Sequence, residues 1–199
     1  METGRFRTIQ KRLEETLDEY RYVHTLGVAL TAAALAMRYE TDVEKAELAG
    51  LLHDCAKSIP KNRQYAICEE HGVALSEYEL RNPSLVHSKL GAYMAQAEYG
   101  VEDEDVLEAI RVHTTGKPDM SLLQKIVYVA DLIEPHRDDI IPDIARIRHL
   151  AFTDIDEAVF ITVKGTIDNL AERGKEEDPL SRDTYEYYKH IHVLRHGIY

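Results

Sequence analysis

Leu51-Leu52-His53-Asp54-Cys55-Ala56-Lys57 decides the fold, because it sets an adjacent histidine and aspartate at the end of an otherwise apolar helical run. An imidazole and a carboxylate on the buried face of a helix are costly unless a partner, such as a metal ion, satisfies both. The pair therefore predicts further polar partners on other elements of the chain.

The composition is typical of one globular domain. Of the 199 residues, 44% are hydrophobic and 30% are charged, and the chain has six prolines and ten glycines. A chain of this length and composition can bury a core, and it is neither disordered nor fibrous. We expect a single domain over residues 1–199, with a core at about 18–140 and C-terminal helices at about 142–199 packed on it.

Location and partner classes follow from the same composition. No stretch reaches the length of a membrane span, and the first residues lack the apolar region of a secretory signal. We therefore expect a cytoplasmic protein with no membrane partner. The formal net charge of −12 argues against duplex nucleic acid, which needs clustered Lys and Arg. Cys55 and Cys68 form no CxxC pair and no disulfide framework, so we expect reduced thiols.

Apolar residues recur at helical spacing through nearly the whole chain, which predicts an all-α fold without strands. One or two helices between about Arg7 and Arg38 carry His24 on their inner face. The sequence Thr41-Asp42-Val43-Glu44 is a capping box, and it predicts a helix from about Asp42 to about Lys57. On that helix His53 and Asp54 lie on or beside the packed stripe, so neither points freely into solvent.

Caps and turn residues divide the rest of the chain into further helices. Pro60 opens a short helix that Gly72 closes, and Ser76 caps another; the two look like an insertion over the core. Three further helices are expected from Ser84 to a stop at Gly100, from a cap at Asp103 to about Thr114, and over Leu122 to Ile133. Another starts at Pro142, and a long one extends from about Asp154 to Arg173. After a charged loop at 175–179, a Tyr-rich segment forms the C-terminal helix.

Six candidate metal ligands lie at or near the inner faces of five predicted helices: His24, His53, Asp54, His87, His113 and Asp131. A single histidine on such a face is more often a hydrogen-bonded core or surface residue. Six independent accidents of this kind are improbable. Imidazole and carboxylate suit borderline-to-hard transition metals, and six such ligands can hold two ions if one carboxylate bridges them.

This ordered set resembles a known family, the HD-domain metal-dependent phosphohydrolases. His24, His53-Asp54 and Asp131 follow the family's H…HD…D pattern, while His87 and His113 match the extra pair of its two-metal members. The flanking residues of these ligands, at 21–24, 53–57, 113–116 and 129–137, look like the YqeK branch, the symmetrical bis(nucleosyl)tetraphosphate hydrolases of bacteria. The resemblance covers Arg21 to Asp139 and implies an HD-domain helical bundle.

The resemblance implies a phosphoanhydride hydrolase that cleaves diadenosine tetraphosphate into two ADP at two divalent transition-metal ions. Iron is expected, with manganese, cobalt and zinc as alternatives, because these ligands suit all four. By resemblance, one ion is held by His24, His53, Asp54 and Asp131, and the other by His87, His113 and a bridging Asp54. Water shared by two divalent ions loses a proton near neutral pH and becomes a hydroxide that attacks phosphorus.

Asp54 and Lys57 are the expected catalytic residues. Lys57 lies one turn past the pair and can contact phosphate, unless it is a solvated lysine stabilised by the helix macrodipole. The remaining substrate contacts have two interpretations each. Thr114 and Thr115 donate to phosphate or only cap a helix, Arg137 contacts phosphate or pairs with Asp138 or Asp139, and His136 protonates a leaving group or is simply exposed.

Three further alternatives stay open. The same metals could serve another nucleotide substrate, either a nucleotide monophosphate or a cyclic dinucleotide. A nucleotide-binding module without turnover is the interpretation from a different class. The Tyr-rich tail from Tyr185 to Tyr199 could pack on its own domain or on a second subunit, so a homodimer is one expectation.

Overall fold

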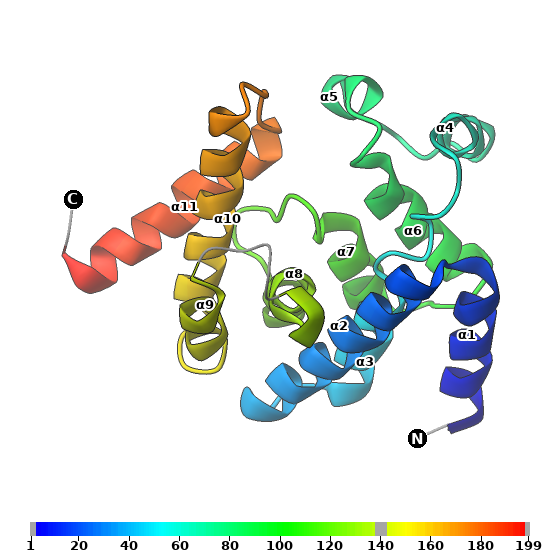
Figure 1. The fold of residues 1–199 in the computed structure, drawn as a ribbon, viewed down its shortest axis with the longest axis horizontal. Coiled ribbons are helices and arrows are strands. Elements are labelled where there is room, and N and C mark those ends of the chain that lie inside the picture. Colours follow the sequence, from blue (N-terminus) through cyan, green and yellow to red (C-terminus); the bar gives the residue numbers. More distant parts are fainter. Residues whose placement is uncertain (1–2, 138–142, 198–199) are drawn as a thin grey trace.

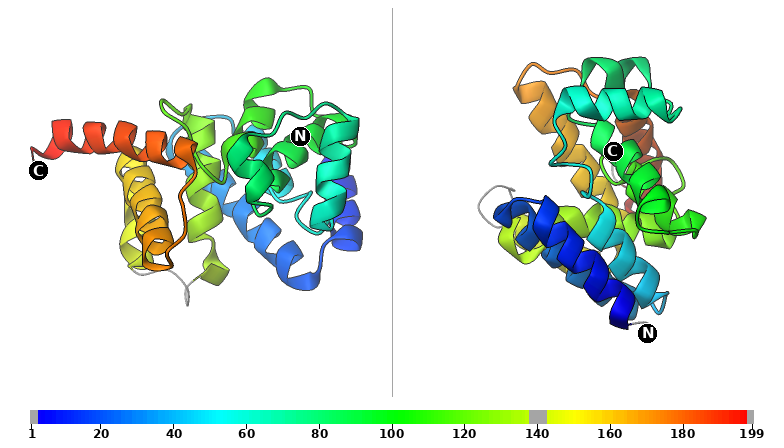
Figure 2. Two further views of the ribbon diagram at one scale, coloured as in Figure 1. Left: turned by 90° about the horizontal axis from the view of Figure 1, so that it is seen from above. Right: turned by 90° about the vertical axis from the view of Figure 1, so that its right-hand side faces the viewer.

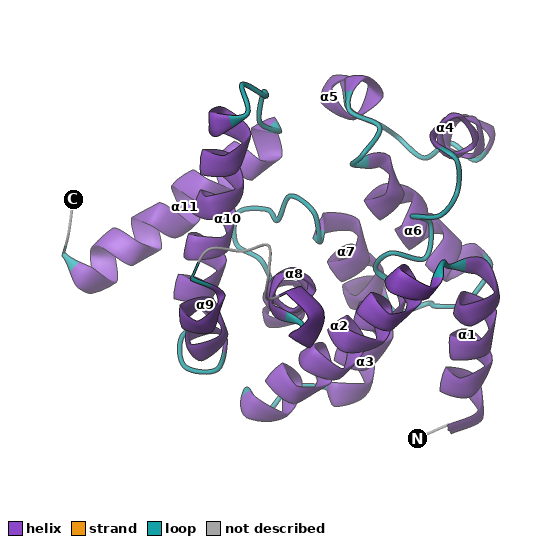
Figure 3. Cartoon of the chain, in the orientation of Figure 1, coloured by secondary structure: helices purple, strands orange, loops and turns teal. Residues whose placement is uncertain are grey.

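The computed structural model describes residues 3–137 and 143–197, and within these ranges every regular element is a helix. The all-α prediction is therefore confirmed for the described residues (Figures 1 and 3). The elements are α1 (Thr3–Thr16), α2 (Glu19–Arg38), α3 (Val43–Leu52), α4 (Lys61–Glu70), α5 (Glu77–Arg81), α6 (Val86–Ala97), α7 (Glu104–Val112), α8 (Leu122–Ile133), the 3-10 turn η1 (Pro135–Arg137), α9 (Ile144–Ala151), α10 (Ile155–Glu172) and α11 (Pro179–His196).

The centre of the molecule consists of α2, α3, α7 and α8, which pack against one another. Their inward side chains are aliphatic and fully buried, for example Val28, Leu52, Ile110 and Ile126. The helices α2 and α3 approach closely at Gly50, because a Cβ atom built there would lie 2.9 Å from the Cα of Ala29. The tight core holds the inner faces of these helices, and the polar residues on them, in fixed positions.

The remaining helices cover this centre from two sides. The segment α4–α6 lies on one side and the α9–α11 group on the other, with α1 beside α2 (Figures 1 and 2). One cluster of buried hydrophobic side chains extends from Ile9 in α1 to Tyr188 in α11. The buried core is thus continuous from α1 to α11, and the C-terminal helices contribute to it. The division into a single domain stays a prediction.

The Tyr-rich helix α11 packs on its own chain. Tyr188 is fully buried, and its hydroxyl accepts a hydrogen bond from the backbone N–H of Met120 (3.2 Å). Tyr185 stacks on Phe160 of α10 with the ring centroids 6.0 Å apart. The described part of the Tyr-rich segment thus packs on its own domain, and its packing on a second subunit stays a prediction.

Most predicted helix boundaries are confirmed by the caps. The Ser76 side chain forms a capping box with Glu79 at the start of α5. Asp103 and Asp154 accept backbone N–H groups at the starts of α7 and α10. These are local devices that join a side chain to the backbone two or three residues later, which explains why the sequence predicts them well. The predicted start at Pro142 lies outside the described residues.

The predicted start of α3 near Asp42 is confirmed, but the predicted capping residue and the predicted C-terminal end were wrong. Its N-cap is Asp42, whose side chain accepts a hydrogen bond from the N–H of Lys45 (3.0 Å), and not Thr41 of the supposed capping box. The helix ends at Leu52 rather than at Lys57. Tight turns follow, in which the N–H of Cys55 donates to the carbonyl of Leu52 and that of Lys57 to the carbonyl of Asp54. These turns advance the chain by about three residues per turn, which changes the directions of the side chains at the His-Asp pair.

No helix in the part of the chain that the structure describes is long and apolar enough to cross a membrane.

Candidate metal centre

His53 and Asp54 lie in the tight turns that follow Leu52, the last residue of α3, at the centre of the helical core. His53 is completely buried and Asp54 is 5% exposed. Four other candidate ligands converge on them from α2, α6, α7 and α8: His24, His87, His113 and Asp131. All six candidate ligands are thus brought together.

The four imidazole rings are held in the same way, each through its Nδ1 atom. Three of them lie close to the backbone carbonyl three residues earlier: His53 to Gly50 (2.7 Å), His87 to Ser84 (2.8 Å) and His113 to Ile110 (2.8 Å). A carbonyl only accepts, so Nδ1 of each ring carries the proton and donates it. The Nε2 atom is then left with a lone pair that can bind a metal ion.

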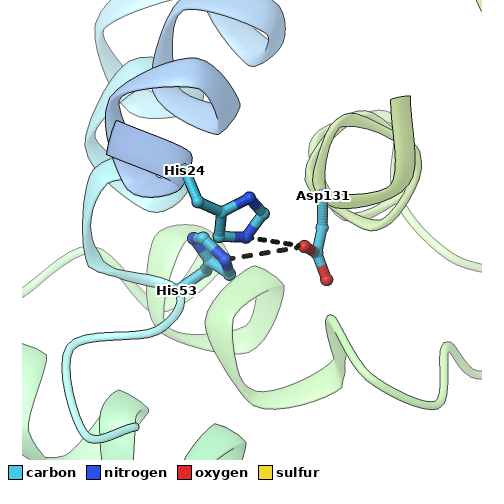
Figure 4. Close-up of side chains that lie close together, drawn as sticks. All are labelled: His24, His53 and Asp131. Carbon is cyan, nitrogen blue, oxygen red and sulfur yellow. Dashed lines mark ion pairs between the residues drawn. The ribbon is translucent and has the colours of Figure 1, made fainter. Parts of the chain in front are cut away.

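One half of the centre contains His24, His53 and Asp131 (Figure 4). The Oδ1 atom of Asp131 lies 3.1 Å from Nε2 of His24 and 3.8 Å from Nε2 of His53. The two histidine rings stand edge to face, with centroids 5.3 Å apart. Nitrogen and oxygen ligands thus point from three different helical segments at one position.

The other half is built around Asp54. Its Oδ1 atom lies 3.1 Å from Nε2 of His87 and 3.5 Å from Nε2 of His113, while its Oδ2 atom lies 3.8 Å from Nε2 of His53. The Nε2 atoms of His87 and His113 are 3.2 Å apart. Asp54 therefore directs one oxygen to each half of the centre, which is the arrangement that a bridging carboxylate requires.

Two buried atoms indicate that these residues fit metal ions. Nε2 of His53 and Oδ1 of Asp54 are buried without a hydrogen bond of acceptable geometry among the described residues, although Asp131 lies 3.8 Å from the first atom and Lys57 lies 3.4 Å from the second. A buried polar atom without a partner is costly. Atoms that crowd together without pairing are typical of ligands that share a central cation, so the donor set fits divalent metals.

The protonation states suit metal binding. Burial lowers the pKa of His53 and of His87 to about 4, so both rings are neutral at pH 7. Burial would raise the pKa of Asp54, but His53, His113, His87 and Lys57 together hold it well below its ordinary value. Neutral imidazole and ionised carboxylate are the forms that bind metals, so little proton release needs to accompany binding.

The sequence analysis assigned no role to Glu134, which the structure places behind His24. This carboxylate is 1% exposed, and its Oε1 atom lies 3.1 Å from Nδ1 of His24. Its Oε2 atom accepts the backbone N–H of His136 (2.9 Å). Gly27 makes room for it, because a Cβ atom at Gly27 would lie 2.5 Å from Oε2. The only signal in the sequence is the position of Glu134 three residues after Asp131.

Two cationic side chains flank the centre. The Nζ atom of Lys57 lies 2.9 Å from Nε2 of His87 and 3.4 Å from Oδ1 of Asp54. The Arg137 guanidinium donates to Oδ1 of Asp131 (2.8 Å) and lies 3.3 Å from Nε2 of His24. Each cation thus stands beside one half of the centre. The alternative partners of Arg137, Asp138 and Asp139, lie outside the described residues.

The other substrate candidates differ in access. Thr114 is half-buried, with its hydroxyl 3.4 Å from that of Ser88. Thr115 is buried, and its hydroxyl donates to the carbonyl of Gly116 (3.0 Å). His136 is exposed and its Nδ1 atom faces Glu134 (3.1 Å), so Glu134 lies between this ring and His24. Of the two threonines, Thr114 therefore has the more accessible hydroxyl.

A cavity of about 510 Å³ opens beside the second half of the centre. It is lined by Ser84 and Thr114 at the end near His87, and by Tyr78, Arg81 and Leu85 from the α5–α6 side. Residues of the α10–α11 side, including Leu170 and Lys175, complete it. Neither Arg81 nor Lys175 forms an ion pair with another described residue. The cavity thus combines apolar walls with two cations, Arg81 and Lys175, and with two carboxylates, Glu176 and Asp178.

Comparisons with known proteins agree with this geometry. The HD domain family model matches residues 21–136. The symmetrical bis(5'-nucleosyl)-tetraphosphatase of Bacillus subtilis is 42% identical over 88% of this chain and 91% of its own length. The enzyme of the same name from Staphylococcus aureus is 39% identical over 79% of this chain and 81% of its own length.

A solved structure has the same fold. The crystal structure of an HD-superfamily hydrolase from Clostridium acetobutylicum, described as involved in NAD metabolism, superposes with a TM-score of 0.89 at 39% identity. The match covers 94% of this chain and 97% of that one. Taken with the converging ligands of the H…HD…D pattern, these matches establish that the chain belongs to the HD-domain family.

Proposed function

We propose that the protein hydrolyses diadenosine tetraphosphate symmetrically, into two molecules of ADP. The observation that carries this proposal is the position of Asp54, whose Oδ2 atom faces His53 while its Oδ1 atom faces His87 and His113. The extent of similarity to two symmetrical bis(5'-nucleosyl)-tetraphosphatases supports the choice of substrate.

The centre would hold two divalent ions. His24, His53, Asp54 and Asp131 would bind one, and His87, His113 and Asp54 the other; their convergence supports this assignment. When bound, such ions would polarise phosphate oxygens and lower the pKa of the attacking water. Iron is the metal we propose, with manganese, cobalt and zinc as alternatives for the same ligands. Metal analysis of protein purified without chelator tests the identity and the number.

The residues of the chain itself would position the substrate. Lys57 and Arg137, one beside each half of the centre, would bind phosphate oxygens on either side of the bond that breaks. Thr114 would donate its hydroxyl to the chain of phosphates from the rim of the cavity. The hydroxyl of Thr115 is already engaged by the carbonyl of Gly116 and the ring of His136 faces Glu134, so either residue would have to give up that contact to bind phosphate or a leaving group.

One nucleoside end of the substrate would occupy the cavity between the α5–α6 and α10–α11 sides. Its volume of about 510 Å³ suits a nucleoside, and Tyr78, Leu85 and Leu170 offer apolar surface to a base. Arg81 and Lys175 would attract the adjoining phosphates.

The direct test is product analysis. Protein loaded with Fe²⁺ or Mn²⁺ is incubated with diadenosine tetraphosphate, and the nucleotides are separated by chromatography. We expect ADP alone. A mixture of AMP and ATP would contradict symmetrical cleavage, and no turnover would favour a nucleotide-binding module. A parallel panel of nucleotide monophosphates and cyclic dinucleotides decides whether another substrate of this class is hydrolysed faster.

An Asp54→Asn variant tests the role of the carboxylate. It keeps the size of the side chain but removes the charge, so we expect activity to fall to the background rate and one fewer ion to bind. Asp168→Asn is the matched control, because Asp168 is an exposed partner of Lys164 far along α10. Full activity of the Asp54 variant would refute the two-metal proposal.

The oligomeric state and the cellular location stay predictions. A homodimer is tested by light scattering of the purified protein over a range of concentrations. A cytoplasmic location is tested by fractionation of cells that produce the protein.

A further inference from the structure

A second group of metal-type ligands lies outside the centre described above, where α11 crosses the start of α10. It consists of Glu157 in α10 and His192 and His196 in α11. One ligand atom from each of the three lies within 4.8 Å of the other two. These helices form the layer on one side of the central core, and the end of α11 projects away from the rest of the molecule (Figures 1 and 2).

The geometry of this group is well defined. His192 and His196 are four residues apart in one helix, so their side chains lie on the same face. The Oε2 atom of Glu157 is 2.7 Å from Nδ1 of His192 and 3.7 Å from Nε2 of His196. The His192 ring stacks on Phe160 with centroids 4.5 Å apart, which holds it in place.

Glu157 has a buried carboxylate without a permanent cation beside it. The residue is 8% exposed, and among the described residues only the two histidines lie within ion-pair distance of its carboxylate. The nearby Arg195 is engaged elsewhere, because it pairs with Asp154 (2.8 Å) and Asp156 (2.6 Å). A buried carboxylate of this kind is stabilised by a positive charge, which a bound cation would supply.

We propose that Glu157, His192 and His196 form a second metal site, for one divalent transition-metal ion of the zinc type. Two histidines and one glutamate are a known ligand set for zinc, with water completing the coordination. Ligands about 2.0–2.2 Å from a tetrahedral ion lie about 3.3 Å from one another. The observed separations of 2.7 Å and 3.7 Å bracket that value, so small side-chain shifts suffice.

The ion would fasten the end of α11 to α10. The last turns of α11 have little apolar packing, and Leu194 is 71% exposed. The first half of the same helix contacts the candidate active site, because the hydroxyl of Thr184 donates to the carbonyl of Thr115 (3.1 Å). The site is thus structural: it stabilises α11 without contacting substrate.

The zinc content of three proteins after loading with Zn²⁺ tests the proposal. The wild-type protein, a His196→Ala variant and a His190→Ala control are loaded with Zn²⁺, passed through a desalting column and analysed for bound metal. His190 is an exposed histidine of the same helix outside the group. We expect His196→Ala to bind one ion fewer than the other two proteins, and to show a smaller rise in Tm with Zn²⁺ than they do. Hydrolysis of diadenosine tetraphosphate should be unchanged.

His196 is exposed, so its replacement leaves the fold intact and the result can be interpreted. A Glu157→Gln variant, checked by circular dichroism, provides the second measurement, and it should also bind one ion fewer. Equal zinc content and equal Tm shifts in wild type and His196→Ala would overturn the proposal. So would a loss of activity together with the lost ion, because the ion would then belong to the catalytic centre.

Discussion

The Nδ1 atom of His24 lies 3.1 Å from the Oε1 atom of Glu134, a carboxylate 110 residues further along the chain. In the other three histidines of the centre, the Nδ1 atom contacts a backbone carbonyl oxygen instead of a carboxylate. A carboxylate behind a metal-binding imidazole fixes the ring and raises its basicity. Glu134 is therefore a positioning residue for the proposed metal ligand His24.

A Glu134→Gln variant should bind metal about 10- to 100-fold more weakly than the wild type, because the amide keeps an acceptor but removes the charge. Competition with a fluorescent chelator measures this affinity without reference to activity. Glu172→Gln, at the exposed end of α10, is the control. Unchanged affinity in Glu134→Gln would mean that Glu134 serves only as an acceptor for the turn at His136.

Lys57 gives a kinetic prediction. Replacement by Met keeps most of the apolar stem, and kcat should fall about 10²- to 10³-fold because a cation that faces the developing phosphate charge is removed. The KM value should change less. Lys164→Met, at an exposed position in α10, is the matched control. If Lys57 only stabilises the end of its turn, steady-state kinetics will show an unchanged kcat and a slightly lower Tm.

Gly27 should be intolerant of any side chain. In Gly27→Ala the new methyl group would lie 2.5 Å from Oε2 of Glu134, and the resulting overpacking should destabilise the protein by about 1–3 kcal/mol. Gly165→Ala is the control in another helix, where nothing lies within 4 Å of the added atom. It should be stabilising by about 0.5–1 kcal/mol, because alanine favours helix more than glycine does. Urea unfolding of both variants measures the two effects, and a neutral Gly27→Ala would show that Glu134 can move.

The metal-free protein should lose stability as the pH falls from about 6.5 towards 4. Burial lowers the pKa of His53 and His87 to about 4, whereas unfolded histidine titrates near 6.5. Between these values the unfolded state binds protons that the folded state does not, so the unfolding free energy decreases with falling pH. Each ring contributes about 1.4 kcal/mol per pH unit in this window. His24, whose pKa is raised, acts in the opposite direction above pH 6.5.

Urea unfolding in the presence of chelator, at intervals from pH 7 to pH 5, measures this slope. A His53→Gln variant should show a shallower dependence than the wild type, and a variant of the exposed His71 should not. A flat curve for the wild type would show that the two rings are protonated in the folded state at these pH values.

Local features of the sequence determined most of the helix boundaries. The caps at Ser76, Asp103 and Asp154 act over two or three residues, so they can be identified without knowledge of the fold. The end of α3 is the exception. Its sequence favours helix through Lys57, but the chain turns at His53, where the His-Asp pair meets ligands from other helices. At His53, contacts between residues far apart in the sequence outweigh the local preference for helix.

The sequence by itself also determined which six residues are brought together, because each is a polar group on a helix face that is otherwise apolar. Only the tertiary structure decided how they face one another. The division of the Asp54 oxygens between two sets of histidines, the contact of Glu134 with His24 and the meeting of Glu157 with His192 all join separate helices. Such contacts depend on how the helices cross and pack, and hydrophobic periodicity within one helix carries no information about that crossing.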